Sequence, residues 1–185
     1  MKINTIQFCS DLHLGHKFAA LARGFNLDIN KHNEIIIQSI AKTANKRTIT
    51  WILGDVCMRI EDMPLLMRIP GRLKLVRGNH DQFNMGVYNQ YFEETHGLTR
   101  YKRFWLSHCP IHPQEMYKNI GNIHGHIHKN TRSPFLSLPY FNVNWDFWKR
   151  AVSLEEIQQI FTKYNSNWYI KLLYKLNILS YVNTN

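Results

Sequence analysis

Short apolar runs rich in β-branched and aromatic residues alternate along the chain with longer segments of helical spacing. The runs predict strands at Ile3–Cys9 and within residues 47–55, 72–81, 99–110, 121–128 and 139–148. Helical spacing predicts helices at residues 31–46, 63–69 and 86–95, and a further helix that begins after Ser153. Strands that alternate with helices in this way are typical of the α/β class.

Two of the expected helices carry signals for where they begin. Asn30 precedes the apolar stripe of the first one and is its expected N-cap. Ser153 and Glu156 have the spacing of a capping box, and Val152 is placed to contact Ile157 across the first turn.

A length of 185 residues suits one domain, which we expect to occupy residues 1–165. Residues 166–185 form a basic, aromatic and leucine-rich appendage, which we expect to be a helix packed on the domain. A dimer contact and a helix lying on a membrane surface are the alternatives for this segment.

Composition narrows the class of protein. Hydrophobic residues make up 44% of the chain and charged residues 19%, which is ordinary for a globular protein and excludes disorder of the whole chain. The sequence has neither a run of apolar residues long enough to cross a membrane nor a secretory signal, so we expect a cytoplasmic protein. The net charge of +10 favours anionic partners such as phosphorylated metabolites, nucleic acid or acidic lipid.

Cysteine and histidine differ in how they are distributed. Cys9, Cys57 and Cys109 are widely spaced and form no C-x-x-C pair, so we expect small buried thiols rather than disulfides or a cysteine zinc site. The 10 histidines, in contrast, gather mostly in short clusters. This clustering raises the question of a metal site.

Polar side chains collect where the expected strands end. These residues are Asp11 and His13, then Asp55, then Asn79, His80 and Asp81, then His108, and finally His126 and His128. In α/β folds ligands bind outside the carboxyl ends of the strands, where short loops bring distant segments together. We therefore expect these clusters to form one site.

The residue types in this set are those of a metal centre. Imidazole nitrogens and carboxylate oxygens with one amide oxygen favour borderline divalent ions over Ca²⁺, which prefers oxygen ligands throughout. Six or seven such ligands exceed the need of one ion. They fit two ions about 3.5–4 Å apart that share a carboxylate, an arrangement suited to phosphoryl displacement.

Five segments, SDLHLGH, LGD, RGNHD, SHCP and HGHIH, resemble in sequence and order the blocks of the calcineurin-like metallophosphoesterase family. The first block is most similar to a small single-domain branch from bacteria and phages. The resemblance implies a fold of two packed β-sheets flanked by helices. It also implies two divalent ions, with Mn²⁺ as the leading candidate and Fe²⁺, Zn²⁺, Ni²⁺ and Co²⁺ as alternatives.

The resemblance assigns a role to each matching residue. Asp11, His13 and His128 would hold the first ion, and Asn79, His108 and His126 the second, with Asp55 bridging the two. His80, oriented by Asp81, would lie over the substrate phosphate and offset its charge or protonate the leaving oxygen. A hydroxide bridging the ions would attack the phosphorus atom.

The substrate is a phosphorylated small molecule or nucleotide on this interpretation, and we favour phosphodiesters of nucleotide type. A phosphomonoesterase, a nuclease that uses the basic TRYKRFW segment, and a non-catalytic binding scaffold are the alternatives. His16 either binds substrate or is an ordinary loop residue, and His124 is expected to lie outside the set of metal ligands. The sequence lacks a Cys-x5-Arg motif, a P-loop and a G-x-S-x-G elbow, which excludes three other hydrolytic sites.

Overall fold

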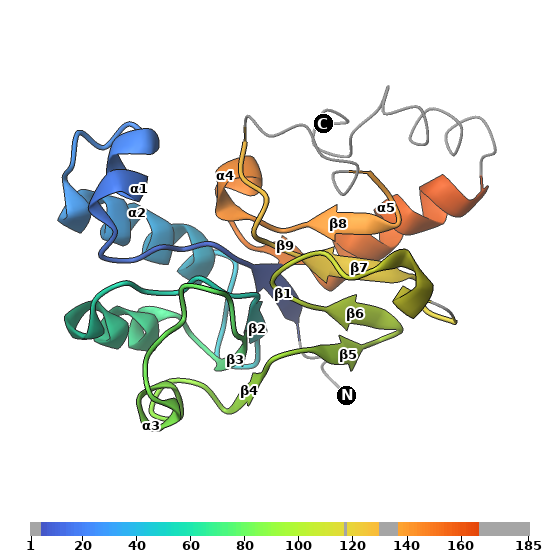
Figure 1. Cartoon of the computed structure of the whole chain (residues 1–185), viewed down its shortest axis with the longest axis horizontal. Helices are drawn as coiled ribbons and strands as arrows, with labels where there is room; N and C mark the ends of the chain where they lie inside the picture. Colours follow the sequence, from blue (N-terminus) through green and yellow to red (C-terminus); the bar gives the residue numbers. More distant parts are fainter. Residues whose placement is uncertain (1–4, 117, 130–136, 167–185) are drawn as a thin grey trace.

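Two β-sheets form the centre of the protein (Figure 1). The structure is a computed structural model that describes residues 5–116, 118–129 and 137–166. One sheet has the strand order β4-β3-β2-β1-β9, with bounds Glu94–His96, Arg72–Val76, Ile49–Ile52, Ile6–Cys9 and Val152–Ser153. The other has the order β5-β6-β7-β8, with bounds Thr99–Tyr101, Phe104–Leu106, Gly121–His124 and Tyr140–Asn142.

Both sheets are mixed. In the five-stranded sheet β1 to β4 are parallel and β9 is antiparallel to β1. In the four-stranded sheet β6, β7 and β8 are parallel, whereas β5 and β6 are antiparallel. The predicted α/β fold with two sheets flanked by helices is therefore confirmed.

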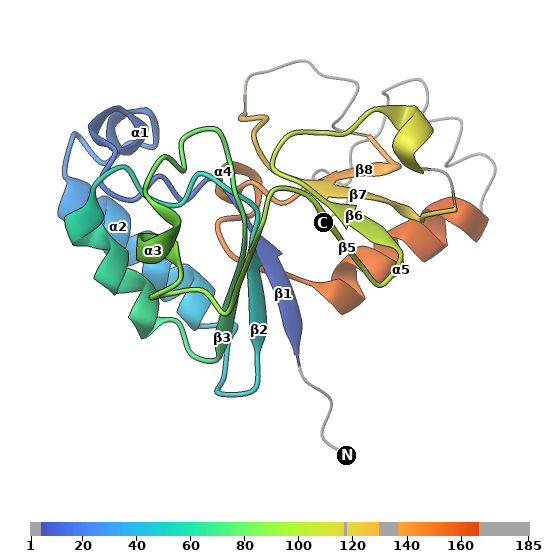
Figure 2. The same cartoon turned by 60° about the horizontal axis from the view of Figure 1, so that its bottom comes forward.

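Helices flank the sheets (Figure 2). Their bounds are Lys17–Ala22 for α1, Ile29–Ala41 for α2, Ile60–Arg68 for η1, Met85–Tyr88 for α3, Pro113–Met116 for η2, Trp145–Trp148 for α4 and Leu154–Ser166 for α5. Helices α1, α2, η1 and α3 lie on one side of the five-stranded sheet, and α5 runs beside the four-stranded sheet. Among the residues described, no helix is long and apolar enough to cross a lipid bilayer.

Alternation along the strands divides the apolar side chains between two cores. Cys9 and Ile52 pack with the isoleucines of α2. Their neighbours Phe8 and Trp51 point to the opposite face and pack with the four-stranded sheet and α5. Successive residues of a strand face opposite ways, so a sheet covered on both faces needs strands that are apolar throughout.

Several predicted boundaries are wrong. The side chain of Asp28, rather than Asn30, caps α2 by accepting a hydrogen bond from the Lys31 amide. The predicted helix at residues 86–95 is shorter and is followed by β4. The run at residues 99–110, predicted as one strand, forms the β5–β6 hairpin, because Lys102 and Arg103 both adopt positive φ in a two-residue turn.

One of the two hydrogen bonds of the predicted capping box is present. The Ser153 hydroxyl accepts a hydrogen bond of 3.1 Å from the Glu156 amide. The Glu156 carboxylate binds the Arg150 guanidinium instead of reaching back to the cap. Residues 167–185, which include almost all of the predicted helical appendage, lie outside the described part of the chain.

Candidate metal centre

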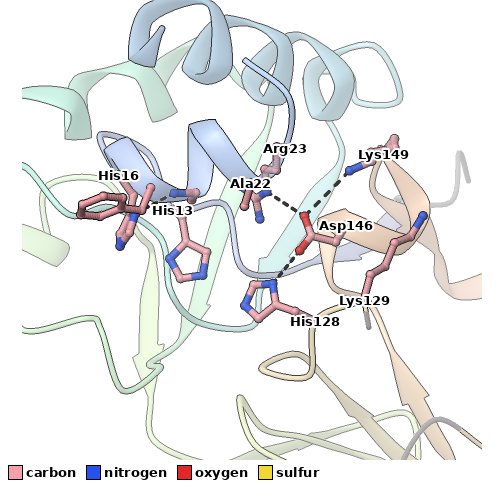
Figure 3. A pocket seen from close by; sticks show the side chains of 10 residues that line it. His13, His16, Ala22, Arg23, His128, Lys129, Asp146 and Lys149 are labelled. Atoms are coloured by element: carbon pink, nitrogen blue, oxygen red, sulfur yellow. Dashed lines mark hydrogen bonds and ion pairs between the residues drawn. The ribbon is translucent and has the colours of Figure 1, made fainter. Parts of the chain in front are cut away.

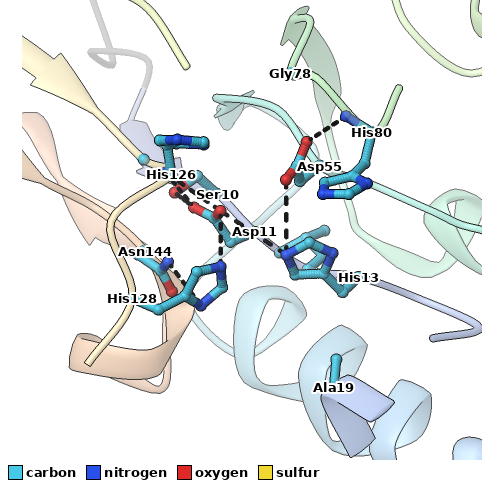
Figure 4. Close-up of polar contacts among 12 residues, drawn as sticks. Ser10, Asp11, His13, Ala19, Asp55, Gly78, His80, His126, His128 and Asn144 are labelled. Carbon is cyan, nitrogen blue, oxygen red and sulfur yellow. Dashed lines mark hydrogen bonds and ion pairs between the residues drawn. The ribbon is translucent and has the colours of Figure 1, made fainter. Parts of the chain in front are cut away.

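The loops that follow β1 and β2 are joined by backbone hydrogen bonds. The amide of Asp11 donates to the Gly54 carbonyl at 2.9 Å, and the amide of His13 donates to the Asp55 carbonyl at 2.9 Å. Ser10 pairs with Asn144 beyond β8, which brings the carboxyl ends of β1 and β8, one from each sheet, together. The strand ends identified in the sequence therefore meet at one place (Figure 4).

Four of the candidate ligands have positive φ. The angles are 58° for Asp11, 49° for His13, 54° for Asp55 and 68° for His126. Residues other than glycine rarely adopt positive φ, because the conformation is strained and the surrounding structure must impose it. Such residues are more frequent at functional sites. The loops therefore hold these side chains in directions that a continuing strand would not give them.

Gly54 allows the loops to approach closely. It has a φ of 87°, and a side chain there would collide with the His108 ring and with the backbone of Gly78. Glycine alone meets both demands at this position. Asp55 is thereby brought next to the histidine that follows β6.

The first group of candidate ligands is Asp11, His13 and His128. The Asp11 Oδ1 atom lies 3.9 Å from His13 Nε2 and 3.5 Å from His128 Nε2. Asp11 is fully buried, and this burial raises the pKa of its carboxyl. A cation at this position would offset that desolvation.

The second group is centred on His108. Its Nε2 atom lies 3.0 Å from Asn79 Oδ1 and 3.2 Å from His126 Nδ1. Its Nδ1 atom bonds to the carbonyl of Leu53 at 2.8 Å, so Nδ1 is the protonated nitrogen of the neutral ring. When the ring is neutral, as metal binding requires, the lone pair of Nε2 faces Asn79 and His126.

Asp55 lies between the two groups. Its Oδ2 atom is 3.7 Å from His13 Nε2 and 3.4 Å from His108 Nε2. Its Oδ1 atom accepts a hydrogen bond of 2.9 Å from the amide of His80, which fixes the orientation of the carboxylate. One carboxylate oxygen thus faces a histidine from each group.

The donor set fits divalent metal ions. Atoms that each lie about 2.1 Å from one ion are separated from each other by roughly 3–3.5 Å, which the spacings around His108 and Asp55 match. Burial and the nearby Arg23 lower the pKa of His13 to about 3, so its ring is neutral and able to bind metal at pH 7. The buried Nδ1 atom of His13 has no hydrogen-bond partner among the described residues.

The family profile of the calcineurin-like phosphoesterases matches residues 5–175. The chain belongs to this family. Gene 66 protein of Mycobacterium phage L5 is 27% identical over 190 residues, covering 83% of this chain and 92% of the phage protein. Gene 66 protein of Mycobacterium phage D29 is 29% identical over 85 residues, covering 43% of this chain and 42% of its own length.

A solved structure supports the fold. A protein of unknown function from Aquifex aeolicus superposes with a TM-score of 0.67 at 23% identity, covering 84% of this chain and 98% of its own. With membership of the calcineurin-like phosphoesterases and the ligand groups above, the chain is a metal-dependent phosphoesterase. Such enzymes act on phosphorylated substrates.

His80, expected to act on the phosphate, and Asp81, expected to orient the His80 ring, differ in their surroundings. His80 is exposed, and its ring centroid lies 5.7 Å from that of His13. Asp81 is buried, and its carboxylate accepts hydrogen bonds from the backbone amides of Asp55, Val56 and Gly78. These bonds hold the loops together, and the role of Asp81 in orienting the His80 ring stays a prediction.

The sequence leaves the role of His16 open and places His124 outside the set of metal ligands. His16 caps α1, where its Nδ1 atom accepts a hydrogen bond from the Ala19 amide, and its ring lies 5.6 Å from the ring of His13. Its Nε2 atom is therefore the protonated nitrogen of the neutral ring. His124 is buried at the end of β7, with its Nδ1 atom bonded to the carbonyl of Gly125 and its ring 6.1 Å from the ring of Tyr140.

Sequence reasoning missed Asp146 and Arg23. The Oδ2 atom of Asp146 lies 2.6 Å from His128 Nδ1, and its Oδ1 atom accepts 2.7 Å from Arg23 Nε. The same guanidinium donates to the carbonyls of Asp11 and Leu12. The predicted strand at residues 139–148 ends at Asn142 instead, and its last part is the helix α4. Asp146 was overlooked because it was counted as part of that strand, although it is a polar residue just beyond β8.

Cys109 departs from the expectation of buried thiols. Cys9 and Cys57 are buried, but Cys109 is exposed. Its sulfur lies within 4.8 Å of ring nitrogens of His108 and His126. A soft donor atom thus lies at the edge of the second ligand group.

Proposed function

We propose that this phosphoesterase hydrolyses nucleotide-type phosphodiesters at a dinuclear metal centre. The observation that carries the proposal is the position of Asp55, whose Oδ2 atom faces His13 at 3.7 Å and His108 at 3.4 Å. A carboxylate between two groups of ligands is the arrangement that two ions share. Asp11, His13 and His128 would hold one ion, and Asn79, His108 and His126 the other.

Two divalent ions held by these ligands would make hydroxide available from water at neutral pH and would supply positive charge for the phosphate oxygens. His80 then offsets the remaining charge or protonates the leaving oxygen from the exposed side of the site. The hydrogen bond from its amide to Asp55 ties the position of His80 to the centre of the ligand set. His16 presents Nε2–H as a further donor to the substrate.

Two finer proposals concern the substrate and the metal. The exposure of Asn79, His80 and His126 supports access by a phosphate that carries two substituents. Nitrogen ligands in both groups support a borderline ion, and we propose Mn²⁺ ahead of Fe²⁺, Zn²⁺, Ni²⁺ and Co²⁺.

Metal analysis together with a substrate comparison tests the proposal. The wild-type protein is loaded with Mn²⁺, its metal content is measured, and it is assayed on bis(p-nitrophenyl) phosphate and on p-nitrophenyl phosphate. We expect two ions per chain and faster hydrolysis of the diester. Asp55→Asn and His126→Ala should lower the metal content, whereas Asp28→Asn, which replaces a helix cap with another good cap, should not.

Three outcomes would contradict parts of the proposal. A single ion per chain in the active protein would exclude the dinuclear centre. Faster hydrolysis of the monoester would exclude the diester preference. Full metal content in His126→Ala would remove His126 from the ligands.

A further inference from the structure

A cavity of about 570 Å³ opens beside the His13 and His128 side of the metal centre (Figure 3). Its wall includes Lys129 and Lys149, which lie on one side of His128, while His16 lies beyond His13 on the other. A phosphate group bound at the metal centre would leave this volume for the rest of the substrate. The chemistry of the wall therefore bears on which substrates fit.

Positive charge exceeds negative charge in this wall. Asp146 is the acidic residue among its lining side chains, and both of its oxygens are engaged by Arg23 at 2.7 Å and His128 at 2.6 Å. The ammonium of Lys149 lies 3.8 Å from Asp146 and 4.1 Å from the centroid of the Trp145 ring. Lys129 is exposed, and the carboxylate of Asp146 is already engaged by Arg23 and His128, so the two lysines leave positive charge available to a ligand.

An aromatic side chain completes the wall. Phe18 is 71% exposed although it is large and apolar, and its ring lies 6.3 Å from the ring of His16. Exposed aromatic rings beside cationic groups are the elements with which proteins bind bases and phosphates together. The same cavity is thus lined by candidate metal ligands, two lysines and the exposed ring of Phe18.

We propose that this cavity binds a second phosphate group of a nucleotide substrate at Lys129 and Lys149, with the base against Phe18. The inference rests on the proposed function and defines its substrate class more closely: a nucleotide ester that carries another phosphate besides the one cleaved. That phosphate belongs either to a small bisphosphorylated nucleotide or to the next residue of a short oligonucleotide. The chemistry recognised is the same in both cases.

A pair of substrates isolates the second phosphate. Thymidine 5′-(p-nitrophenyl phosphate) is compared with the same ester that bears a 3′-phosphate. We expect wild-type kcat/KM to be about tenfold higher for the 3′-phosphorylated ester, a modest value for two solvent-exposed charge contacts. In the double variant Lys129→Gln/Lys149→Gln this ratio should fall close to 1.

A charge-matched variant serves as the control. Lys42→Gln/Lys163→Gln removes two positive charges from exposed positions that do not line the cavity, and it should keep the wild-type ratio. Phe18→Ala should lower kcat/KM for both esters by a similar factor, because both carry the base. A wild-type ratio near 1, or an equal fall of the ratio in both lysine double variants, overturns the inference.

Direct binding separates failure of this inference from failure of the proposed function. Calorimetry on the Mn²⁺-loaded protein compares thymidine 3′,5′-bisphosphate with thymidine 5′-monophosphate. Tighter binding of the bisphosphate that is lost in Lys129→Gln/Lys149→Gln supports the second-phosphate site even if no ester is hydrolysed. Hydrolysis of both esters with equal bisphosphate and monophosphate affinity leaves the proposed function intact and rejects the site.

The affinity of a third ligand distinguishes the two possible sources of the second phosphate. A thymidine dinucleotide with a 5′-phosphate places its second phosphate in an internal linkage rather than at an end. Binding tighter than that of the bisphosphate identifies an oligonucleotide as the source, and weaker binding identifies a small bisphosphorylated nucleotide. The site is rejected if neither ligand binds more tightly than the monophosphate.

Discussion

The Nδ1 atom of His128 lies 2.6 Å from the Oδ2 atom of Asp146. Burial raises the pKa of Asp146, but the hydrogen bond with His128 and the charge of Arg23 lower it by more than burial raises it. The net pKa is below the ordinary value, so the carboxylate is ionised at neutral pH. An ionised carboxylate fixes the proton of the imidazole on Nδ1 and turns the Nε2 lone pair toward Asp11. The pair therefore sets the direction in which His128 can bind a metal ion.

Replacement of Asp146 by Asn should weaken metal binding without removing a ligand. Loss of a carboxylate that orients a ligating histidine typically costs about 10–100-fold in metal affinity, and we expect a loss in this range. Titration calorimetry with Mn²⁺ measures it. Asp28→Asn is the matched control, and equal affinities for the two variants would show that Asp146 does not orient His128.

Replacement of His80 by Ala should separate chemistry from metal binding. His80 offers its backbone amide, rather than its ring, to the ligand Asp55, so the metal content should not change. We expect kcat to fall by about 10²–10⁴-fold, the usual contribution of a general acid. Hydrolysis of bis(p-nitrophenyl) phosphate at the wild-type rate would exclude a catalytic role for the ring.

Replacement of Asp81 by Ala should destabilise the fold. It would leave the backbone amides of Asp55, Val56 and Gly78 without their acceptor in a buried loop. Because each unpaired buried donor costs about 1–3 kcal/mol, we expect a loss of roughly 3 kcal/mol or more in the free energy of unfolding. Urea unfolding in the presence of EDTA measures it free of metal effects. Asp81→Asn keeps one acceptor oxygen and should lose less, and equal losses would contradict this explanation.

The stability of the metal-free protein should fall as the pH rises from 6.5 to about 9. Burial lowers the pKa of His108, but the neighbouring carboxylates of Asp55 and Asp11 raise it by more than burial lowers it. The net effect is a pKa of about 9, compared with the ordinary value of 6.5. A histidine whose pKa is raised by folding stabilises the protein fully below its unfolded pKa, and this contribution is lost as the pH passes the folded pKa. Thermal unfolding in EDTA across this range measures the loss. The slope should become shallower in His108→Asn, and an unchanged slope would assign it to other groups.

Sequence reasoning located the candidate ligands because their positions follow from local pattern. Asp11, Asp55 and His108 each come after a short apolar run, and the ends of neighbouring parallel strands must meet. The same logic predicted the α/β class and the order of most elements. Whether these side chains bind metal stays a prediction that the experiments above test.

Other features depend on conformations and contacts that no local pattern encodes. Lys102 and Arg103 form a hairpin turn with positive φ although neither is a typical turn residue, so a single strand was expected. Asp81 follows His80 directly, which suggested a pair, yet the chain turns its carboxylate toward other amides. Arg23 meets Asp146 across 123 positions of sequence, a separation at which only the assembled fold brings two side chains together.

The candidate ligands come from both sheets. Asp11, His13, Asp55 and Asn79 follow strands of the five-stranded sheet, and His108, His126 and His128 follow strands of the four-stranded sheet. Metal ions bound by both sets of ligands would link the two sheets. A ligand present at about 100 times its dissociation constant adds about 2.7 kcal/mol to folding stability. The concentration of metal would thus set part of the free energy that holds the two sheets together. Chelation of the metal should therefore speed amide hydrogen exchange in β1 and β7.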